Sequence, residues 1–232
     1  MLADYSQLAV PFAAYALPIV DELSPASGPV NGDTAVVFTG TGLARGSRRQ
    51  CAFNRTLVNA SSVDDERLLC LVPPSLIGAG PLSVSISLNG QQFSRLALRF
   101  QQYEEPRVLS LSPAVGHATG GTTVQLHGDH LLGGTDRFCR FGALSPVNAV
   151  PVPGSPSATC LMPPSADTVL APLQLSLNGQ QYTAATSAAR FEYLTTITQL
   201  VVSPASGPVN GDTLLRIASS EFTAGVHFLC RF

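Results

Sequence analysis

Alternating apolar and polar positions recur along the chain and predict short, half-buried β-strands. Residues 82–88 alternate Leu, Val, Ile and Leu with serine, and residues 173–177 alternate three leucines with Gln and Ser. Both runs lead into Asn-Gly, at 89–90 and 178–179, which is a strong signal for a turn between paired strands. No segment shows sustained helical periodicity, so the pattern predicts an all-β fold.

The opening segment of this pattern returns twice, in register. SPASGPVNGDT occupies residues 24–34 and again residues 203–213, and SPAVGHATGGT at 112–122 is a looser middle copy. Aligned on these copies, the sequences agree at glycine, threonine, cysteine and phenylalanine positions, among them Cys51, Cys139, Cys230, Phe53, Phe141 and Phe232. Each unit spans about 90 residues with roughly seven short strands, which is the size of an immunoglobulin-like β-sandwich.

The repeated motif itself has two interpretations. Its Asn-Gly-Asp could contact a metal or a phosphate, but the middle copy has Gly121 in place of the aspartate, which argues against a ligand common to all units. We therefore interpret the motif as architecture. Ser-Pro should end the opening strand, Gly28 and Gly32 should give backbone freedom in a turn, and Thr34 should begin the next strand.

The two ends of the chain fit the same repeat. Residues 5–25 match residues 93–113, so we expect the first residues to be the closing strand of a preceding unit. A signal peptide is the alternative for the apolar run at 8–20, but no positive charge precedes it and no convincing small-x-small cleavage site follows. That run is also too short and too broken by prolines for a membrane helix. We therefore expect the chain to be a cut from a longer array. Residues 1–16 should be the last strand of a preceding repeat, residues 17–104 and 105–195 should be complete domains, and residues 196–232 should be the truncated first half of a further domain.

The amino-acid composition excludes some classes of partner but does not indicate a function. Apolar residues make up 45% of the 232 residues, which is enough for hydrophobic cores, while charged residues make up only 12%. The net charge of -2 gives no electrostatic attraction to nucleic acid or to an anionic membrane. We therefore expect no nucleic-acid partner and no membrane-spanning segment within this fragment.

One combined pattern runs through the units: SPxxGPxxGxTxVxFxGxGL, then Cys-x-Phe, then Cys-x-x-Pro-Pro, then an Asn-Gly hairpin that closes on Phe and Tyr. This pattern resembles the IPT/TIG family of immunoglobulin-like domains over nearly the whole chain. The resemblance implies tandem E-set (IPT/TIG) β-sandwiches, two complete and two partial. Domains of this family occur in arrays of large cell-surface and secreted proteins, beside carbohydrate-active enzymes, and as dimerisation domains of intracellular transcription factors.

The cysteines favour the extracellular or cell-surface setting. Their positions in the repeat predict disulfides between Cys51 and Cys70 and between Cys139 and Cys160, with Cys230 left unpaired by truncation. Disulfides persist in oxidising compartments. The alternative is reduced core thiols of a cytosolic protein. Zinc is disfavoured, because neither the ligand spacing nor a Cys-x-x-Cys pair is present.

Two glycosylation sequons lie between the first two cysteines. They are Asn54-Arg-Thr and Asn59-Ala-Ser, in a stretch that should be exposed. The second complete unit has no sequon there, since Asn148-Ala-Val does not qualify. We expect glycosylation at Asn54 and Asn59 if the chain is secreted.

Other polar clusters have plainer explanations. HGDH at 127–130 could be half of a metal site, but the repeat makes His127 and His130 strand-end and turn residues. The acidic run of Asp64, Asp65 and Glu66 could bind calcium, although a solvated loop is favoured. The cluster of Arg45, Arg48 and Arg49 could contact an acidic glycan or partner; the other copies do not reproduce it, which favours an exposed strand edge.

The sequence contains no Ser/His/Asp or Cys/His arrangement and no phosphate-binding loop, so we expect no catalytic residue, metal or cofactor. The leading hypothesis is a non-enzymatic segment of a large extracellular or cell-surface protein. Its repeats would act as a structural spacer and as an adhesion or assembly module, with protein partners or self-assembly through strand edges. The alternative is an accessory module, binding a glycan or protein ligand, of a multidomain receptor or carbohydrate-active enzyme. A transcription-factor role comes third, because no basic recognition loop is visible.

Overall fold

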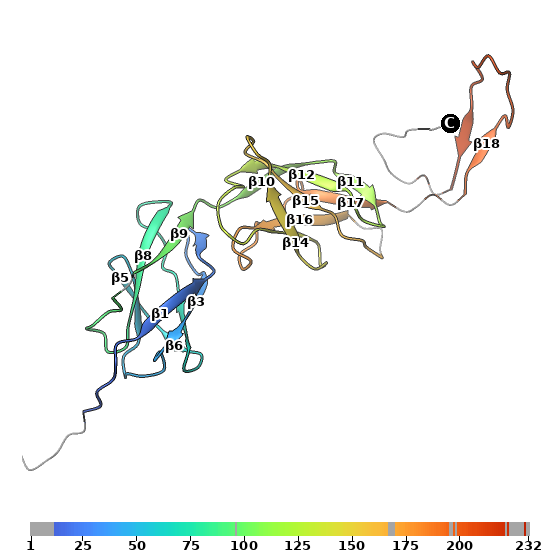
Figure 1. Cartoon of the computed structure of the whole chain (residues 1–232). Coiled ribbons are helices and arrows are strands. Elements are labelled where there is room, and N and C mark those ends of the chain that lie inside the picture. The colour runs from blue at the N-terminus through green and yellow to red at the C-terminus, as the bar shows by residue number, and fades with distance from the viewer. Residues whose placement is uncertain are drawn as a thin grey trace, which may run out of the picture. The chain divides into compact units, whose positions relative to one another are not determined.

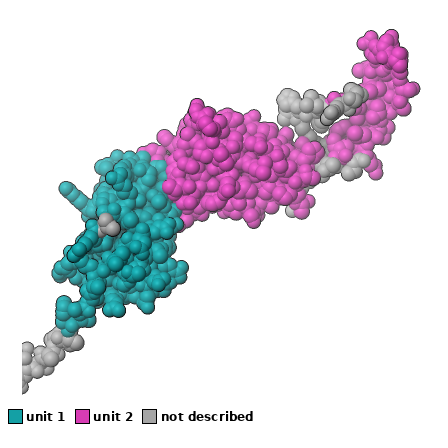
Figure 2. All heavy atoms as spheres, viewed as in Figure 1, with its two compact units in different colours: residues 1–103 teal, residues 104–232 magenta. Residues whose placement is uncertain are grey.

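The computed structural model contains β-strands as the regular elements of the residues it describes, with no helix among them (Figure 1). The chain divides into unit 1, residues 1–103, and unit 2, residues 104–232 (Figure 2). Over the described part no helix has the length and apolar character needed to cross a membrane. The described residues are 12–95, 97–166, 170–194, 197, 199–220, 222 and 230.

Unit 1 is a sandwich of two sheets, as the sequence predicts. Every neighbouring pair of strands is antiparallel except β2 and β9, which are parallel. The four-stranded sheet has the order β1 (Ile19–Ser24), β3 (Ala35–Thr41), β7 (Arg67–Leu71), β6 (Ser61–Ser62). The five-stranded sheet has the order β2 (Ser27–Pro29), β9 (Leu98–Tyr103), β8 (Gly80–Ser87), β4 (Gln50–Phe53), β5 (Thr56–Asn59).

Unit 2 repeats this arrangement with one difference. Its strand β14 is unbroken: Val147 and Asn148 pair with β13 and residues 149–151 pair with β15, so both layers belong to one eight-stranded sheet. In unit 1 the equivalent segment is interrupted at Ala60, and its halves β5 and β6 pair with different sheets. The order in unit 2 is β10 (Arg107–Ser112), β12 (Thr123–Asp129), β15 (Ala158–Leu161), β14 (Val147–Pro151), β13 (Phe138–Phe141), β16 (Leu170–Ser176), β17 (Arg190–Leu194), β11 (Val115–His117).

The third copy of the motif starts in the same way. Strands β18 (Val201–Ser203) and β19 (Arg216–Ala218) pair antiparallel, as β1 with β3 and β10 with β12. A cis Ser-Pro bond follows the first strand in all three copies. At the other end, residues 12–18 form no strand, and residues 1–11 of the expected preceding strand lie outside the described residues.

Alternation places the cores as predicted. Val36 and Phe38 of β3 are fully buried, and Val37 between them is only partly buried. The rings of Phe53 and Phe100 pack edge to face, with their centres 6.3 Å apart. In unit 2 the corresponding aromatic group is Phe141, Phe191 and Tyr193, all with edge-to-face geometry. Such pairs add to the hydrophobic stabilisation of burying the rings.

The Asn-Gly turns are held by the asparagine side chains. Asn89 Oδ1 accepts the backbone N–H groups of Gln91 and Gln92, each at 3.0 Å. Asn178 Oδ1 does the same for the two residues in the same places of unit 2, each at 3.1 Å. Both turns join strands that pair, β8 with β9 and β16 with β17, as the sequence predicts.

The expectation that Gly28 lies in a turn is wrong. Gly28 is in strand β2, without a positive φ, and a Cβ atom there would clash with the Thr34 side chain and lie 2.8 Å from the Phe100 ring. The turn is formed by Gly32, with φ 83°. The next residue, Asp33, has φ 58°, and Gly121 at the same place in the middle copy has φ 89°. Because glycine and aspartate both tolerate this left-handed conformation, the backbone explains the exchange.

Candidate functional site

The paired cysteines join the two layers of each sandwich. In unit 1 the disulfide links Cys51 of β4 with Cys70 of β7, and these strands belong to different sheets. In unit 2 the disulfide links Cys139 of β13 with Cys160 of β15. All four side chains are buried in the cores. The fifth cysteine, Cys230, is an exposed free thiol. The disulfides therefore serve as cross-links between layers, and they offer no ligand an open face.

Both sequon asparagines are exposed at the ends of strand β5. Asn54 lies in the turn between β4 and β5 with φ 52°, a conformation that asparagine adopts more readily than most residues. Its Oδ1 accepts the N–H of Ser83 at 2.8 Å, and its own N–H donates to the carbonyl of Ser83 at 2.8 Å. Asn59 is the last residue of β5, and Ser61 of its sequon begins β6.

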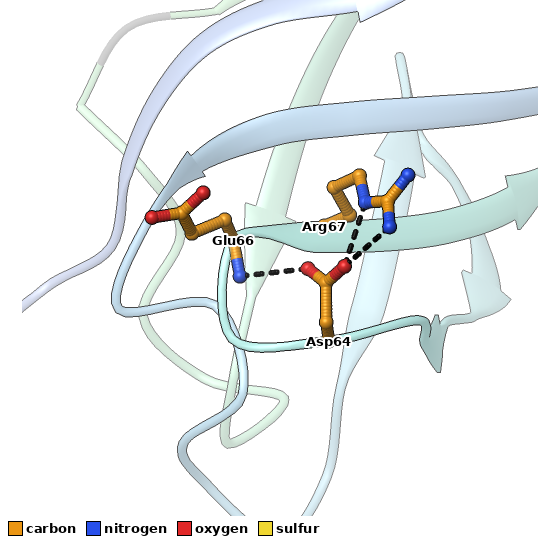
Figure 3. Close-up of polar contacts among 3 residues, drawn as sticks. All are labelled: Asp64, Glu66 and Arg67. Atoms are coloured by element: carbon orange, nitrogen blue, oxygen red, sulfur yellow. Dashed lines mark hydrogen bonds and ion pairs between the residues drawn. The ribbon is translucent and has the colours of Figure 1, made fainter.

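The acidic run forms the turn between β6 and β7, as Figure 3 shows. Asp64 makes an ion pair with Arg67, with 2.6 Å between Oδ2 and Nη2, and its Oδ1 accepts the N–H of Glu66 at 3.0 Å. The hydrogen bond from Arg67 lowers the pKa of Asp64. Because the Asp64 carboxylate already pairs with Arg67, it stabilises the turn, and the arrangement does not favour calcium binding. Among the described residues no group of three His, Cys, Asp or Glu side chains could hold a metal ion.

The two histidines of HGDH occupy ordinary strand and turn positions. His127 is exposed within β12, and His130 follows the strand with φ 56°. Gly42, at the place of His130 in unit 1, also has a positive φ of 75°. His130 is therefore a turn residue.

The arginine cluster contains a structural residue that the sequence interpretation missed. Arg49 is partly buried and not at an exposed edge; its guanidinium donates to the carbonyls of Ala44 and Arg45, holding the loop before β4. Arg137 does the same in unit 2, donating to the carbonyls of Gly133 at 3.2 Å and Leu132 at 3.1 Å. The arginine cluster as a whole is not repeated, but an arginine recurs at this one position, as Arg49 and Arg137. That recurrence is the sequence signal that could have identified its structural role.

The outer face of β13 and β16 in unit 2 carries a polar-aromatic group that sequence reasoning also missed. The guanidinium carbon of Arg140 lies 4.2 Å from the centre of the Tyr182 ring. Arg140 Nη2 donates to Gln174 Oε1 at 2.9 Å, and Gln174 Nε2 donates to the carbonyl of Thr183 at 2.7 Å. The Arg140 Nε–H has no hydrogen-bond partner among the described residues. That Nε–H is buried, and the cation–π contact and the bond to Gln174 fix the orientation of the guanidinium.

Unit 2 alone has this group. At the equivalent places of unit 1 the strand pair has Ala52 opposite Ser85, where unit 2 has Arg140 opposite Gln174. Arginine, tyrosine and other aromatic residues are enriched at protein contacts. We define Arg140, Gln174 and Tyr182 as the β13–β16 face.

Unit 1 in turn presents aliphatic side chains on an ordered loop. Leu76 and Ile77, in the turn after β7, are 94% and 90% exposed. Ser75 fixes this turn, because its Oγ donates to the carbonyl of Gly78 at 2.6 Å and accepts the N–H of Ile77 at 3.3 Å. We call residues 75–78 the apolar turn. Unit 2 has Ala166 where unit 1 has Leu76.

An open apolar hollow of ≈ 1110 Å³ over β18 and β19 is lined by residues that include Leu215 and Ile217. Their counterparts in unit 1, Val36 and Phe38, are core residues. The hollow is therefore the core-facing side of a repeat and not a ligand pocket.

Comparisons with known proteins agree with this architecture. The family model for the IPT/TIG domain matches residues 18–101 and 106–193. Plexin-A2 of Mus musculus is 29% identical over 164 residues, covering 67% of this chain, and Plexin-A3 of Rattus norvegicus is 26% identical over 137 residues, covering 56%. The matched parts are only 9% and 7% of those proteins, respectively. The solved full extracellular region of Plexin A4 has a TM-score of 0.56 and 19% identity, covering 83% of this chain and 18% of that one.

Proposed function

Since the chain belongs to the IPT/TIG domain family, we propose that it is a non-enzymatic segment of a large protein in which these repeats act as a spacer and as an adhesion or assembly module. One observation carries the proposal. Each complete repeat has its two layers joined by a buried disulfide, so that each unit resists separation of its sheets. A cross-link between layers suits a spacer that must keep its shape under load.

The chain is extracellular or at the cell surface. Its two disulfides require an oxidising compartment. Its relatives by sequence are plexins, and its fold is shared with a plexin extracellular region.

The apolar turn of unit 1 is the contact point that we propose for adhesion. Two adjacent aliphatic side chains that are almost fully exposed gain free energy when a partner covers them, since removing apolar area from water is favourable by about 25 cal/mol per Å². The hydrogen bonds of Ser75 keep the turn ordered, which lowers the entropic cost of binding.

A bead-aggregation assay tests this function. Beads coated with the full chain should aggregate, and beads coated with a Leu76→Ala, Ile77→Asp variant should stay dispersed. The matched control is Leu214→Ala, which truncates another exposed leucine outside the turn. If the wild-type beads stay dispersed, or if the variant aggregates equally, the proposed adhesive role of this turn is wrong.

A second function, that of an accessory binding module, is favoured by the β13–β16 face. Its oriented guanidinium and the adjoining Tyr182 ring are suited to a ligand that combines a carboxylate with an apolar surface, such as an acidic glycan. Binding of a uronic-acid oligosaccharide should be lost in Arg140→Ala and retained in Arg190→Ala, an exposed arginine on neighbouring β17. Equal binding by both variants would remove this alternative.

A further inference from the structure

The segment that contains Ala60 gives unit 1 a longer open edge than unit 2 has at the equivalent place. In unit 2 only Val147 and Asn148 of β14 pair with β13, and residues 149–151 pair with β15, whereas all four residues of β5 pair with β4. In unit 1 the equivalent strands β5 and β6 are each the last strand of a sheet. An unpaired strand edge is a template for pairing with another chain.

The edge of β5 is regular, and its free backbone groups can be identified. The N–H of Ala60 donates to the carbonyl of Arg49 at 3.0 Å, so these two residues form a hydrogen-bonded pair. Bonded and non-bonded pairs alternate along antiparallel strands. The register Ala52↔Leu57 and Gln50↔Asn59 therefore belongs to non-bonded pairs. It follows that Leu57 and Asn59 direct their N–H and C=O groups away from β4, toward the open edge.

The other edges of the two sandwiches are short or bulged, and β6 has only two residues. Strands β1 and β10 each contain a bulge, between Val20 and Glu22 and between Val108 and Ser110. Strands β2 and β11 have only three residues each. Bulges and short length are two ways in which proteins blunt edges. Strand β5 has neither a bulge nor a charged side chain, and its Leu57 is 51% exposed.

The sequons lie at the two ends of this one open strand. Asn54 lies two residues before β5, in the turn that leads into it, and Asn59 ends the strand. Strand β14, which pairs only two residues with β13, has Asn148-Ala-Val and no sequon. We propose that Asn54 and Asn59 carry N-linked glycans, and that these glycans cover the open edge of β5 and keep it from pairing with a second chain.

The chemistry requires only what a secretory pathway supplies. The side-chain Nδ2 forms a bond to the anomeric carbon of an oligosaccharide, the bond from that carbon to a lipid-diphosphate carrier breaks, and Nδ2 loses one proton as the diphosphate leaves. The fold accommodates both products, since both asparagines are exposed. At Asn54 the atom that binds β8 is Oδ1, and this hydrogen bond to Ser83 does not use Nδ2.

The inference rests on the extracellular setting but not on the adhesive turn. Glycans at β5 would restrict assembly to other surfaces of the chain, which include the apolar turn. The bead assay and the experiment below therefore have separate outcomes: loss of aggregation reports on Leu76 and Ile77, whereas glycan mass and oligomeric state report on β5.

The test uses the full chain with Cys230→Ser, secreted from eukaryotic cells. Glycopeptide mass spectrometry should find a glycan at both Asn54 and Asn59. Light scattering of the dilute chain should find a monomer, because the small apolar turn holds copies together only through the many simultaneous contacts of a coated bead. The Asn54→Gln, Asn59→Gln variant should self-associate, at least doubling the mass. The control Asn148→Gln changes an exposed asparagine of β14 and should remain monomeric.

Two further variants keep the result independent of misfolding. Thr56→Ala with Ser61→Ala removes both sequons and retains the hydrogen bond of Asn54 to Ser83, and it should self-associate as well. Adding Leu57→Pro should restore the monomer, because the N–H that proline lacks points away from β4. Absence of glycan at either asparagine would overturn the proposed modification. A monomeric variant without glycans would overturn the proposed covering of the edge.

Discussion

Cys51 of β4 and Cys70 of β7 face each other between the two sheets of unit 1, and their disulfide is the covalent bond between these layers. The loop that it closes contains the whole of β5 and β6. The feature that stabilises the unit therefore also encloses its open edge and its sequons. In unit 2 the disulfide between Cys139 and Cys160 encloses β14 in the same way.

Removing the disulfide of unit 1 should destabilise that unit and leave the other unchanged. Cys51→Ala with Cys70→Ala frees a loop of 19 residues and should cost about 3 kcal/mol of unfolding free energy. Hydrogen exchange followed by mass spectrometry should show lost protection in the core strands of unit 1, such as β3, β4 and β7, and not in those of unit 2. Equal loss in β12 and β13 would contradict the assignment of one cross-link to each unit.

Two adjacent glycines should differ sharply in their tolerance of substitution. A Cβ at Gly120 would lie 2.8 Å from the backbone nitrogen of Pro164, and φ is 85°. Gly120→Ala should therefore cost at least about 2 kcal/mol. At Gly121 φ is 89°, but the space is open, and unit 1 has Asp33 there. Gly121→Asp should cost less than about 1 kcal/mol, as urea unfolding can measure.

Arg137 should contribute to stability through its hydrogen bonds to the loop before β13. Arg137→Ala should cost about 1 kcal/mol, since the side chain is partly exposed and its two acceptors are left to solvent. Arg48→Ala, at an exposed residue just before the equivalent position of unit 1, is the control and should be close to neutral. Thermal unfolding of both variants makes the comparison; equal losses would contradict the role given to Arg137.

Tyr193 should make stability depend on alkaline pH. Burial raises its pKa to about 12, from the usual value near 10. The unfolded chain therefore loses this proton first, so the contribution of Tyr193 is fully present below about pH 10 and falls as the pH rises toward 12. Burial also raises the pKa of Tyr103.

The matching variant is Tyr193→Phe. Among the described residues its hydroxyl has no hydrogen-bond partner, so the change should cost less than about 1 kcal/mol at neutral pH. The variant should lose less stability than the wild type between pH 10 and 12, as denaturant midpoints at each pH would show. Identical pH profiles would contradict the assignment.

Features that depend on residues close in sequence were predictable. Alternation identified Val36 and Phe38 as core residues, and Asn-Gly identified both turns, because strand period and turn geometry are local properties. The position of Gly28 was not predictable, since its requirement for a small residue comes from the Thr34 side chain and from the Phe100 ring of the neighbouring strand β9. The contacts of Arg140 were not predictable either, because its partners Gln174 and Tyr182 lie more than 30 residues later in the chain.

The difference between the two units at Ala60 was likewise invisible in the sequence. In both units the segment passes from one layer to the other, but four of its residues pair with β4 in unit 1 and only two pair with β13 in unit 2. These pairings join residues that are far apart in the sequence. The sequons could be found from three residues each, but their relation to an open edge required the ladder. The sequence therefore identifies Asn54 and Asn59, and the strand pairing shows that they flank an open edge.

The central claim is that disulfides close each repeat of an extracellular array, and cysteine counting by mass tests it most directly. The secreted chain with Cys230→Ser would be unfolded without reductant, alkylated and weighed, and then treated again after reduction. We predict no alkylation before reduction and full alkylation of Cys51, Cys70, Cys139 and Cys160 after it. Alkylation of these four thiols before reduction would contradict the account.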